Sequence, residues 1–342
     1  MNYVQHTICV QPSGYSSMNQ YVSATIQAIL AGGISAAIAG VSAMPWCALF
    51  AIPVTAAVWL IAYCQWWLYG RLVCLGGDHT AVGMLVSVEP PENKSGFDAL
   101  DTDYSINLLL PPNKPGVNQA TAEASSPYGF LIKEQAATKD IGLPFKGEAA
   151  TDKGTGVKSA ILHCEFEGAG VADTMLGAQI GLGLAVAALI VCLAVPPPWG
   201  MIIAGILAFL ALLAMLLGLL IGLGDTGSPG DVNPSLGALH TNDASKGGLG
   251  ADLLVVHGTW IYDSAHEGWN EIHPIKLCER VGTWNGDWPA DLDDQIKRWE
   301  GVIADAIKPQ TIAGQTEPQN HWEVHPGVDG CQPGGGDLPP IH

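Results

Sequence analysis

Four residues of types that can bind metals or move protons lie close together in the C-terminal third of the sequence. The stretch reads HGTWIYDSAHEGWNEIHPIK and contains Asp263, His266, Glu271 and His273. Because side chains alternate along a strand, Glu271 and His273 share one face, while Asp263 and His266 lie at the preceding turn. Imidazole and carboxylate ligands suit a divalent metal ion, so one hypothesis is a metal site made of these four residues.

The same stretch also fits a β-hairpin without chemistry. Asp263 suits the start of a turn, Gly268 gives the turn its backbone freedom, and Pro274 would end the hydrogen bonding of the second strand. This structural interpretation is the simplest one, with a metal site and a proton-transfer site as alternatives. The run His321-Trp322-Glu323-Val324-His325 repeats part of the pattern and could bring further ligands to such a site.

Motifs for other catalytic chemistry are lacking. The sequence has no nucleophile-elbow, phosphate-loop or zinc-protease motif, and no dinucleotide fingerprint in a strand-turn-helix context. We therefore expect a protein that is not an enzyme and that needs no cofactor, unless the four-residue stretch holds a divalent metal.

The charged residues are confined to two parts of the chain. Only 13% of the 342 residues are charged, while 48% are hydrophobic; about 25% charged residues is usual in soluble domains. No Asp, Glu, Lys or Arg occurs in residues 1–70 or 174–224. Because charge is costly in hydrocarbon, we expect both stretches to lie in a membrane.

Each charge-free stretch is long enough for two membrane helices of roughly 30 Å. The expected helices cover residues 21–43, 47–70, 172–195 and 201–223. A Pro-Trp sequence separates the helices of each pair, at Pro45 and at Pro198. Proline stops a helix and tryptophan favours the membrane interface, so we predict two transmembrane hairpins, 21–70 and 172–224.

Small residues recur every four positions along two of these helices. They are Ala24, Ala28, Gly32, Ala36 and Gly40 in the first helix, and Gly177 and Gly181 in the third. Such stripes let helices approach closely in lipid, so we predict packing faces, directed either within the chain or toward a neighbouring one. A channel or pore formed by the glycine-rich hairpins is a further hypothesis, although no helix carries a ring-forming charge.

Five short runs outside the hairpins are typical of strands. They cover residues 81–88, 103–110, 159–166, 252–262 and 269–275. Five short strands suggest a small closed barrel of the OB type. The predicted fold class is an α+β membrane protein, with four transmembrane helices in two hairpins and a five-stranded OB-like β-barrel into which the second hairpin is inserted.

The other segments complete the expected domain organisation. The parts are an N-terminal tail (1–20), two barrel segments (71–171 and 250–285), a flexible linker (225–249), an amphipathic helix region (286–316) and a C-terminal tail (317–342).

The chain also resembles a family of uncharacterised bacterial proteins with an OB-like β domain. The resemblance lies in an Asp-rich strand start, Asp101-Thr102-Asp103-Tyr104, a strand similar to Leu162-His163-Cys164-Glu165, and a D-x-x-H-x-G-W-x-E-I-H-P hairpin that begins at Asp263. It covers about 130 residues and no membrane segment. The resemblance implies a fold and no activity, and the inserted hairpin departs from it.

The cysteines and the charged residues bear on the type of protein, its partners and its location in the cell. The eight cysteines show neither a disulfide framework nor a zinc ribbon. A net charge of −18 argues against a nucleic-acid partner. Neither hairpin tip carries Lys or Arg, whereas Arg71 follows a helix, which favours a bacterial inner-membrane protein with a cytoplasmic soluble domain.

Two functions follow as hypotheses. The first is a non-enzymatic integral membrane protein in contact with membrane lipids, whose barrel mediates protein–protein assembly by self-association or within a membrane complex. The second is a membrane-anchored, metal-dependent enzyme of the hydrolase type that uses His266, Glu271 and His273.

Overall fold

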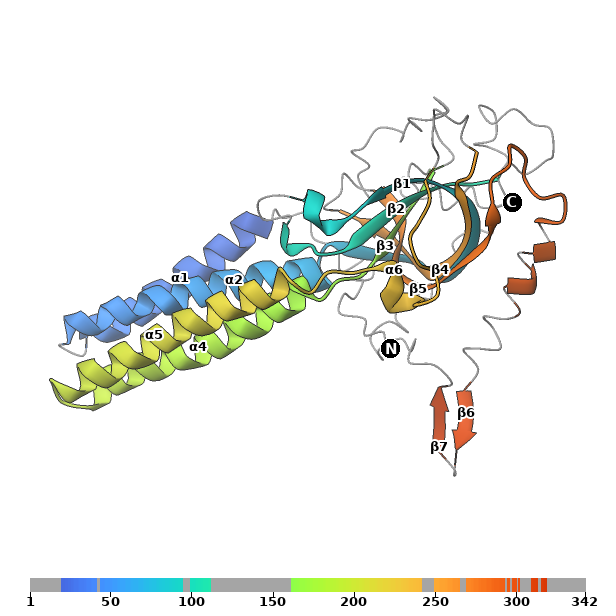
Figure 1. Ribbon diagram of the computed structural model, residues 1–342. Helices are drawn as coiled ribbons and strands as arrows, with labels where there is room; N and C mark the ends of the chain where they lie inside the picture. The colour runs from blue at the N-terminus through green and yellow to red at the C-terminus, as the bar shows by residue number, and fades with distance from the viewer. Residues whose placement is uncertain are drawn as a thin grey trace.

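The computed structural model shows a mixed helix and sheet protein in which long helices extend from one end of a sheet body (Figure 1). The structure describes residues 20–41, 44–94, 99–111, 161–241, 249–264 and 269–292, and then 294–295, 297–299, 301, 309–312 and 315–318.

Four helices are long and apolar enough to cross a membrane, as predicted. They are α1 (Gln20–Val41), α2 (Ala51–Tyr69), α4 (Gly170–Ala194) and α5 (Trp199–Gly222), with the 3-10 helix η2 (Pro45–Phe50) leading into α2. Their sequences are rich in Ala, Leu, Ile, Val and Gly, and their one charged residue is Asp173 in the first turn of α4, which suits helices surrounded by lipid. This arrangement is consistent with an integral membrane protein.

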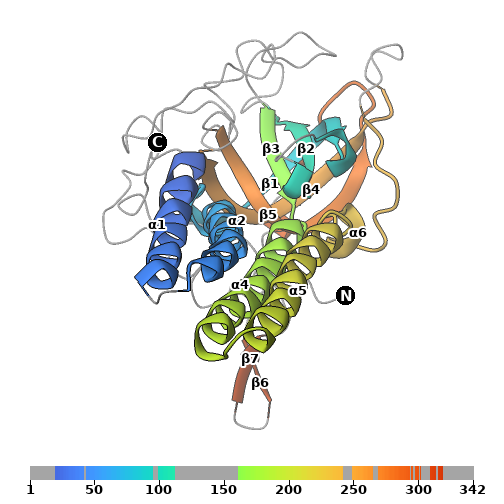
Figure 2. The same ribbon diagram turned by 90° about the vertical axis from the view of Figure 1, so that its left-hand side faces the viewer.

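The helices pack through small residues. Helix α2 lies between α1 and α4, and α5 packs on α4 (Figure 2). Ala24 and Ala28 of α1 are buried. The backbones of Gly177 in α4 and Gly218 in α5 are so close that a Cβ on Gly177 would lie 2.6 Å from the Cα of Gly218. Both stripes therefore make contacts within the chain.

The far end of the first stripe differs from the prediction. Ala36 is only half-buried, and Gly40 is exposed, with nothing within 4 Å of an added Cβ. Ser35 and Ala39 are buried there instead. The cause is helical geometry, because a row of residues four apart rotates by about 40° at each step on a helix of 3.6 residues per turn.

A disulfide joins the two hairpins at the end far from the sheet. Cys47 in η2 is bonded to Cys192 near the end of α4, across 145 residues of sequence, with 5.8 Å between their Cα atoms. The sequence showed no disulfide framework, because these two cysteines lie in different apolar stretches and only the packing of α2 against α4 brings them together.

Five strands form one closed sheet. They are β1 (Leu72–Glu89), β2 (Tyr104–Leu109), β3 (Ile161–Phe166), β4 (Asp252–Asp263) and β5 (Trp269–Thr283). Their order is β1-β2-β3-β5-β4, and β4 pairs with β1 to close the barrel. Neighbouring strands are antiparallel except β3 and β5, whose short parallel ladder pairs His163 with Glu271 and Cys164 with Ile272. Hairpin α4–α5 lies in sequence between β3 and β4.

One set of side chains on these strands forms a large apolar core. It includes Ile106, Leu108, Leu162, Cys164, Phe166, Trp260, Tyr262 and Ile272, all at most 3% exposed. Because successive side chains of a strand point to opposite faces, residues such as His163 and Glu165 lie on the other face of β3, and they are buried too. The sheet thus has an apolar and a polar buried face.

Pro274 does not end its strand, contrary to the prediction. Strand β5 continues to Thr283. The register with β4 shifts on either side of Gly258, which pairs with Ile275. These bulges accommodate a residue that has no amide hydrogen to donate.

The described part of the expected linker packs on the barrel. Helix α6 (Pro229–Val232) begins with a capping box made by Ser228 and Asp231, and Leu236 is 2% exposed in the apolar core. The side chain of Asn233 donates a hydrogen bond to the carbonyl of Cys278. Leu236, together with the partly buried Val232 and Leu239, therefore anchors this segment to the barrel core.

The C-terminal region contains helical residues and a small β-hairpin. The described residues between 292 and 301 are helical, and there Leu292 is buried and Trp299 packs on the core. Strands β6 (Pro309–Ile312) and β7 (Gln315–Pro318) then form a separate hairpin. The run around Glu323 lies outside the described residues.

Candidate functional site

A buried ion network joins the first hairpin to the barrel. Arg71 follows α2 after one glycine and is 1% exposed. Its Nη1 lies 2.9 Å from Oδ2 of Asp263 at the end of β4, and its Nη2 lies 3.1 Å from Oδ2 of Asp103 before β2. Asp101 accepts two longer bonds of 3.4 Å from Arg71 and a bond of 3.1 Å from Lys94. The guanidinium also lies 4.5 Å from the ring centroid of Trp67.

The second hairpin enters the barrel at the same place. The amide of Gly168 donates to Oδ1 of Asp103 at 2.6 Å. Thr102 accepts a bond from the amide of Gly170, at the start of α4, and donates to the carbonyl of Asp225, just after α5. Residues 101–103 therefore contact the ends of both hairpins and fix them to one end of the barrel.

Strand β3 adds two polar residues to this region. Glu165 and His163 lie on one face of β3, opposite Ser105 and Asn107 of β2. Ser105 donates to Oε1 of Glu165 at 2.7 Å, and Nδ1 of His163 lies 3.0 Å from Oδ1 of Asn107. Both Glu165 and His163 are at most 3% exposed.

Strand β5 places Glu271 and His273 against these residues. Nδ1 of His273 lies 2.7 Å from Oε2 of Glu165 and 3.7 Å from Oε1 of Glu271. Oε2 of Glu271 lies 3.9 Å from Nε2 of His163. Glu271 is 0% and His273 1% exposed, and neither carboxylate oxygen of Glu271 has a hydrogen-bond partner among the described residues.

These side chains form two groups with the spacing of metal ligands. One ligand atom from each of His163, Glu165 and Glu271 lies within 4.8 Å of the others, and the same holds for Asp103, Glu165 and His273. Glu165 belongs to both groups. Imidazole and carboxylate together suit a divalent transition metal such as Zn²⁺, Mn²⁺ or Fe²⁺.

The network carries an excess of negative charge. Two permanent cations, Arg71 and Lys94, face five carboxylates, which leaves three negative charges unbalanced when both imidazoles are neutral. The five are Asp101, Asp103, Glu165, Asp263 and Glu271. Buried excess charge is strongly unfavourable unless a proton or a cation neutralises it.

The pKa values divide the carboxyl groups into two kinds. Burial and the nearby Glu165 raise the pKa of Glu271 well above its usual range, and burial with the nearby Asp101 does the same for Asp103. Burial also opposes ionisation of Glu165, yet hydrogen bonds with His163 and His273 lower its pKa well below the usual range. Glu165 is therefore the ionised centre of the cluster.

The four residues first singled out are only partly brought together. Glu271 and His273 lie in the cluster, whereas Asp263 is bound to Arg71, and His266 lies outside the described residues. The site role of Glu165, His163 and Asp103 was missed. The signal was present, since His163 and Glu165 alternate in a strand of otherwise apolar residues and Arg71 is the first charge in the chain.

A second polar group lies elsewhere on the barrel. Lys276 is 2% exposed, and its Nζ lies 2.9 Å from both carboxylate oxygens of Asp78. Thr259 donates to the same carboxylate at 2.9 Å. Each of these groups is matched by an oppositely charged or hydrogen-bonding partner, so the cluster stabilises the barrel.

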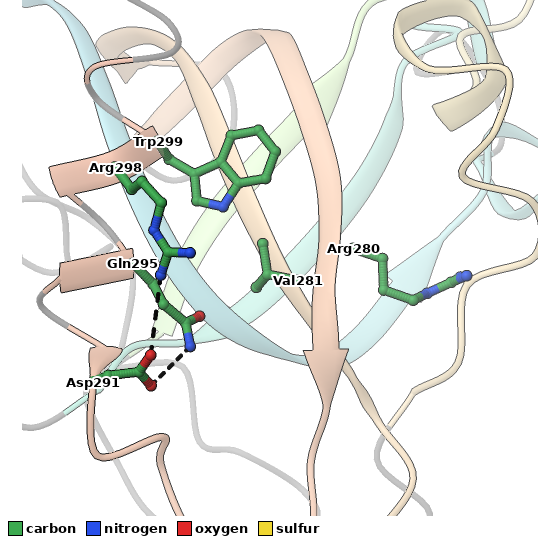
Figure 3. Close-up of a pocket in the computed structure, with 6 residues that line it drawn as sticks. All are labelled: Arg280, Val281, Asp291, Gln295, Arg298 and Trp299. Carbon is green, nitrogen blue, oxygen red and sulfur yellow. Dashed lines mark hydrogen bonds and ion pairs between the residues drawn. The ribbon is translucent and has the colours of Figure 1, made fainter.

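A surface pocket of about 470 Å³ lies apart from both polar groups. It is lined by Arg280 and Val281 of β5 and by Asp291, Gln295, Arg298 and Trp299 of the segment that follows (Figure 3). Asp291 accepts a bond of 2.9 Å from Gln295. The pocket shares no residue with the buried ion network around Arg71, which we call the junction network because it joins both hairpins to the barrel.

No protein-family model, curated protein or solved structure matches this chain. The structure therefore characterises the protein by two features. It has four helices long and apolar enough to cross a membrane, and a sheet body held to them by a buried network of ion pairs.

Proposed function

We propose that this chain is a non-enzymatic integral membrane protein whose OB-like barrel mediates protein–protein assembly, as an oligomer or as a subunit of a membrane complex. The observation that carries the proposal is the junction network. It ties one barrel to both hairpins through Arg71, Thr102 and Asp103, so that the barrel would be held rigidly at the membrane surface. The polar residues of this network are buried between the hairpins and the barrel, so the described residues form no open active site there.

The strand connections support the OB-like assignment. An OB-fold is a five-stranded Greek-key barrel, which agrees with the order β1-β2-β3-β5-β4 and with one parallel pair. A hairpin enters and leaves a membrane on the same side, so α4–α5 can interrupt the chain between β3 and β4 without opening the barrel. The net charge of −18 argues against the nucleic-acid binding that is frequent for this fold.

The cysteines support a cytoplasmic barrel in a bacterial inner membrane. The bridge between Cys47 and Cys192 lies at the hairpin tips, whereas Cys164 and Cys278 in the barrel core are free thiols. Disulfides persist on the oxidising side of a membrane and are rare in the cytosol. This distribution agrees with the absence of Lys and Arg from the hairpin tips.

The pocket next to β5 is the surface that we assign to a protein partner. Trp299 is half-buried and Arg298 is exposed, and Trp and Arg are the residue types most enriched among the energetically important residues of protein interfaces. The small-residue stripes favour no partner helix, because most of their members pack within the chain.

Photo-crosslinking in membranes tests this assignment. A photoreactive amino acid in place of Trp299 should form a crosslinked product with a second protein or a second copy, and Arg298→Glu should reduce that product about tenfold or more. Lys297→Glu is the matched control, because Lys297 is an exposed neighbour outside the pocket. Equal crosslinking in both variants, or no product at all, would contradict the proposal.

Two other functions are less well supported. A metal-dependent hydrolase is favoured by the ligand groups around Glu165, but the burial of those groups leaves no route for a substrate in this conformation. A pore through one chain is not supported, because Gln27, Gln65 and Gln179 all lie on exposed surfaces of the described helices.

A further inference from the structure

One of the ladders that join neighbouring strands of the barrel is much shorter than the others, and we call this short ladder between β3 and β5 the seam. Strands β3 and β5 share a ladder of two residue pairs, whereas β4 and β5 pair over most of their length. The inserted hairpin begins a few residues after β3. Any force that the membrane helices exert on the barrel is therefore transmitted close to its shortest ladder.

The residues that face each other across this seam have the chemistry of a metal site. His163 of β3 is in register with Glu271 of β5, and Glu165 lies on the same face of β3. We propose that His163, Glu165 and Glu271 bind one divalent transition-metal ion, which clamps β3 to β5 at the end of the barrel nearest the membrane. This inference goes beyond the assembly role and does not depend on it.

The hydrogen bonds of His163 orient it as a ligand. The amide nitrogen of Asn107 donates to Ser87 at 3.0 Å, which leaves Oδ1 of Asn107 as the acceptor for Nδ1–H of His163. Nε2 of His163, which lies 3.3 Å from Oε1 of Glu165 and 3.9 Å from Oε2 of Glu271, is then the nitrogen that would bind the metal ion after releasing its proton. A hydrogen bond to the far nitrogen is how proteins usually fix a metal-binding imidazole.

The two carboxylates differ in a way that also points to a ligand. Glu165 is already held by Ser105 and His273, as metal-binding carboxylates usually are. Glu271 is fully buried, and within the part of the chain that the structure describes both of its oxygens lack a hydrogen-bond partner, although they lie beside two imidazoles. A buried carboxylate without hydrogen bonds requires an explanation, and a bound cation supplies one.

The second ligand group is a poorer site. Oδ2 of Asp103 accepts a bond from Arg71 at 3.1 Å, so a cation beside Asp103 and His273 would lie close to a guanidinium. No Lys or Arg of the described ranges forms an ion pair with Glu271, whose ion-pairing neighbours are His163 and His273. A divalent ion there would offset most of the excess negative charge of the network.

The test uses the full-length protein, purified in detergent and treated with a chelator, and then dialysed against Zn²⁺ or Mn²⁺. We expect about one bound ion per chain, with Mg²⁺ unable to compete because it prefers oxygen ligands. Glu271→Gln should weaken binding about tenfold or more. Glu279→Gln is the matched control, since Glu279 is on the same strand and outside the ligand group; its affinity should equal that of the wild type.

A spectroscopic measurement on the wild type covers the case in which the variant does not fold. Bound Mn²⁺ should show magnetic coupling to an imidazole nitrogen in pulsed electron paramagnetic resonance. Less than stoichiometric binding of both ions, a Glu271→Gln variant that binds as the wild type does, or bound Mn²⁺ without nitrogen coupling would each overturn the proposal. Failure here would leave crosslinking at Trp299 unaffected, so the two proposals are tested separately.

Discussion

His163 and Glu271 face each other across the parallel pair of β3 and β5, with 3.9 Å between Nε2 and Oε2. This relationship joins residues 108 positions apart, on either side of the hairpin α4–α5. It also places a carboxylate that has no hydrogen bond to any described residue beside an imidazole whose far nitrogen is held by Asn107. The stability of the seam should therefore depend on what neutralises Glu271.

Neutralising Glu271 should have opposite effects with and without metal. In the presence of a chelator, Glu271→Gln should unfold at a higher temperature than the wild type, because the change removes the free-energy cost of keeping a buried carboxyl group protonated beside Glu165. With excess Zn²⁺ the order should reverse, since only the wild type keeps the full ligand set. A difference of about 1 kcal/mol corresponds to about 2–4 °C. Melting curves in detergent that keep the same order in both conditions would contradict this prediction.

Removing the guanidinium of Arg71 should destabilise the junction strongly. Arg71→Met keeps most of the side-chain volume but leaves Asp263 and Asp103 without their cation, which should lower the free energy of unfolding by about 3–5 kcal/mol. Arg298→Met is the control, because its ion pair with Asp291 is exposed and 4.0 Å long, and it should change stability by less than about 1 kcal/mol. Similar losses in both variants, measured by chemical unfolding, would argue against a special role for Arg71.

The fold itself was predictable to the extent that it depends on local patterns. Charge-free stretches of apolar residues and a Pro-Trp sequence after each first helix were sufficient to predict four helices that could cross a membrane, and the structure has them. Alternating β-branched residues placed the five strands within a few residues, except where β1 and β5 extend beyond Ala81 and Pro274.

The site was less predictable because it is assembled from distant segments. Glu271 and His273 could be placed on one face of a strand, but their partners Glu165 and His163 lie before the second hairpin. Which strands become neighbours depends on closure of the barrel, and a single sequence does not encode that pairing in any local pattern. The ion pair of Asp263 with Arg71 was not expected, because nothing nearby in sequence showed that Arg71 would reach it.

Enlarging Gly177 should separate the helices of the second hairpin. A side chain there would collide with the backbone of Gly218, so Gly177→Leu should lower stability by about 2 kcal/mol or more and reduce the amount of protein in the membrane. Gly183→Leu, in the same helix, is the control, because nothing lies within 4 Å of an added Cβ. If Gly183→Leu is as harmful as Gly177→Leu when both are compared by thermal unfolding, the contact is not the cause.

The cysteines should differ in oxidation state within cells. If the hairpin tips face the oxidising side, acid quenching followed by alkylation of the denatured chain should modify Cys64, Cys164 and Cys278. Cys47 and Cys192 should react only after reduction. Mass spectrometry of the peptides distinguishes these states, and the three free cysteines serve as internal controls. Alkylation of Cys47 and Cys192 before reduction would contradict the proposed orientation.

The central claim is that the chain works as a part of an assembly, and the mass of the particle in native lipid tests it most directly. Extracted in nanodiscs without detergent, the protein should give a particle whose protein mass exceeds one chain of 35.8 kDa, as an oligomer or with a second protein in fixed ratio. Arg298→Glu should shift the mass toward a single chain, and Lys297→Glu should leave it unchanged. A wild-type particle that contains one copy and no other protein would contradict the account.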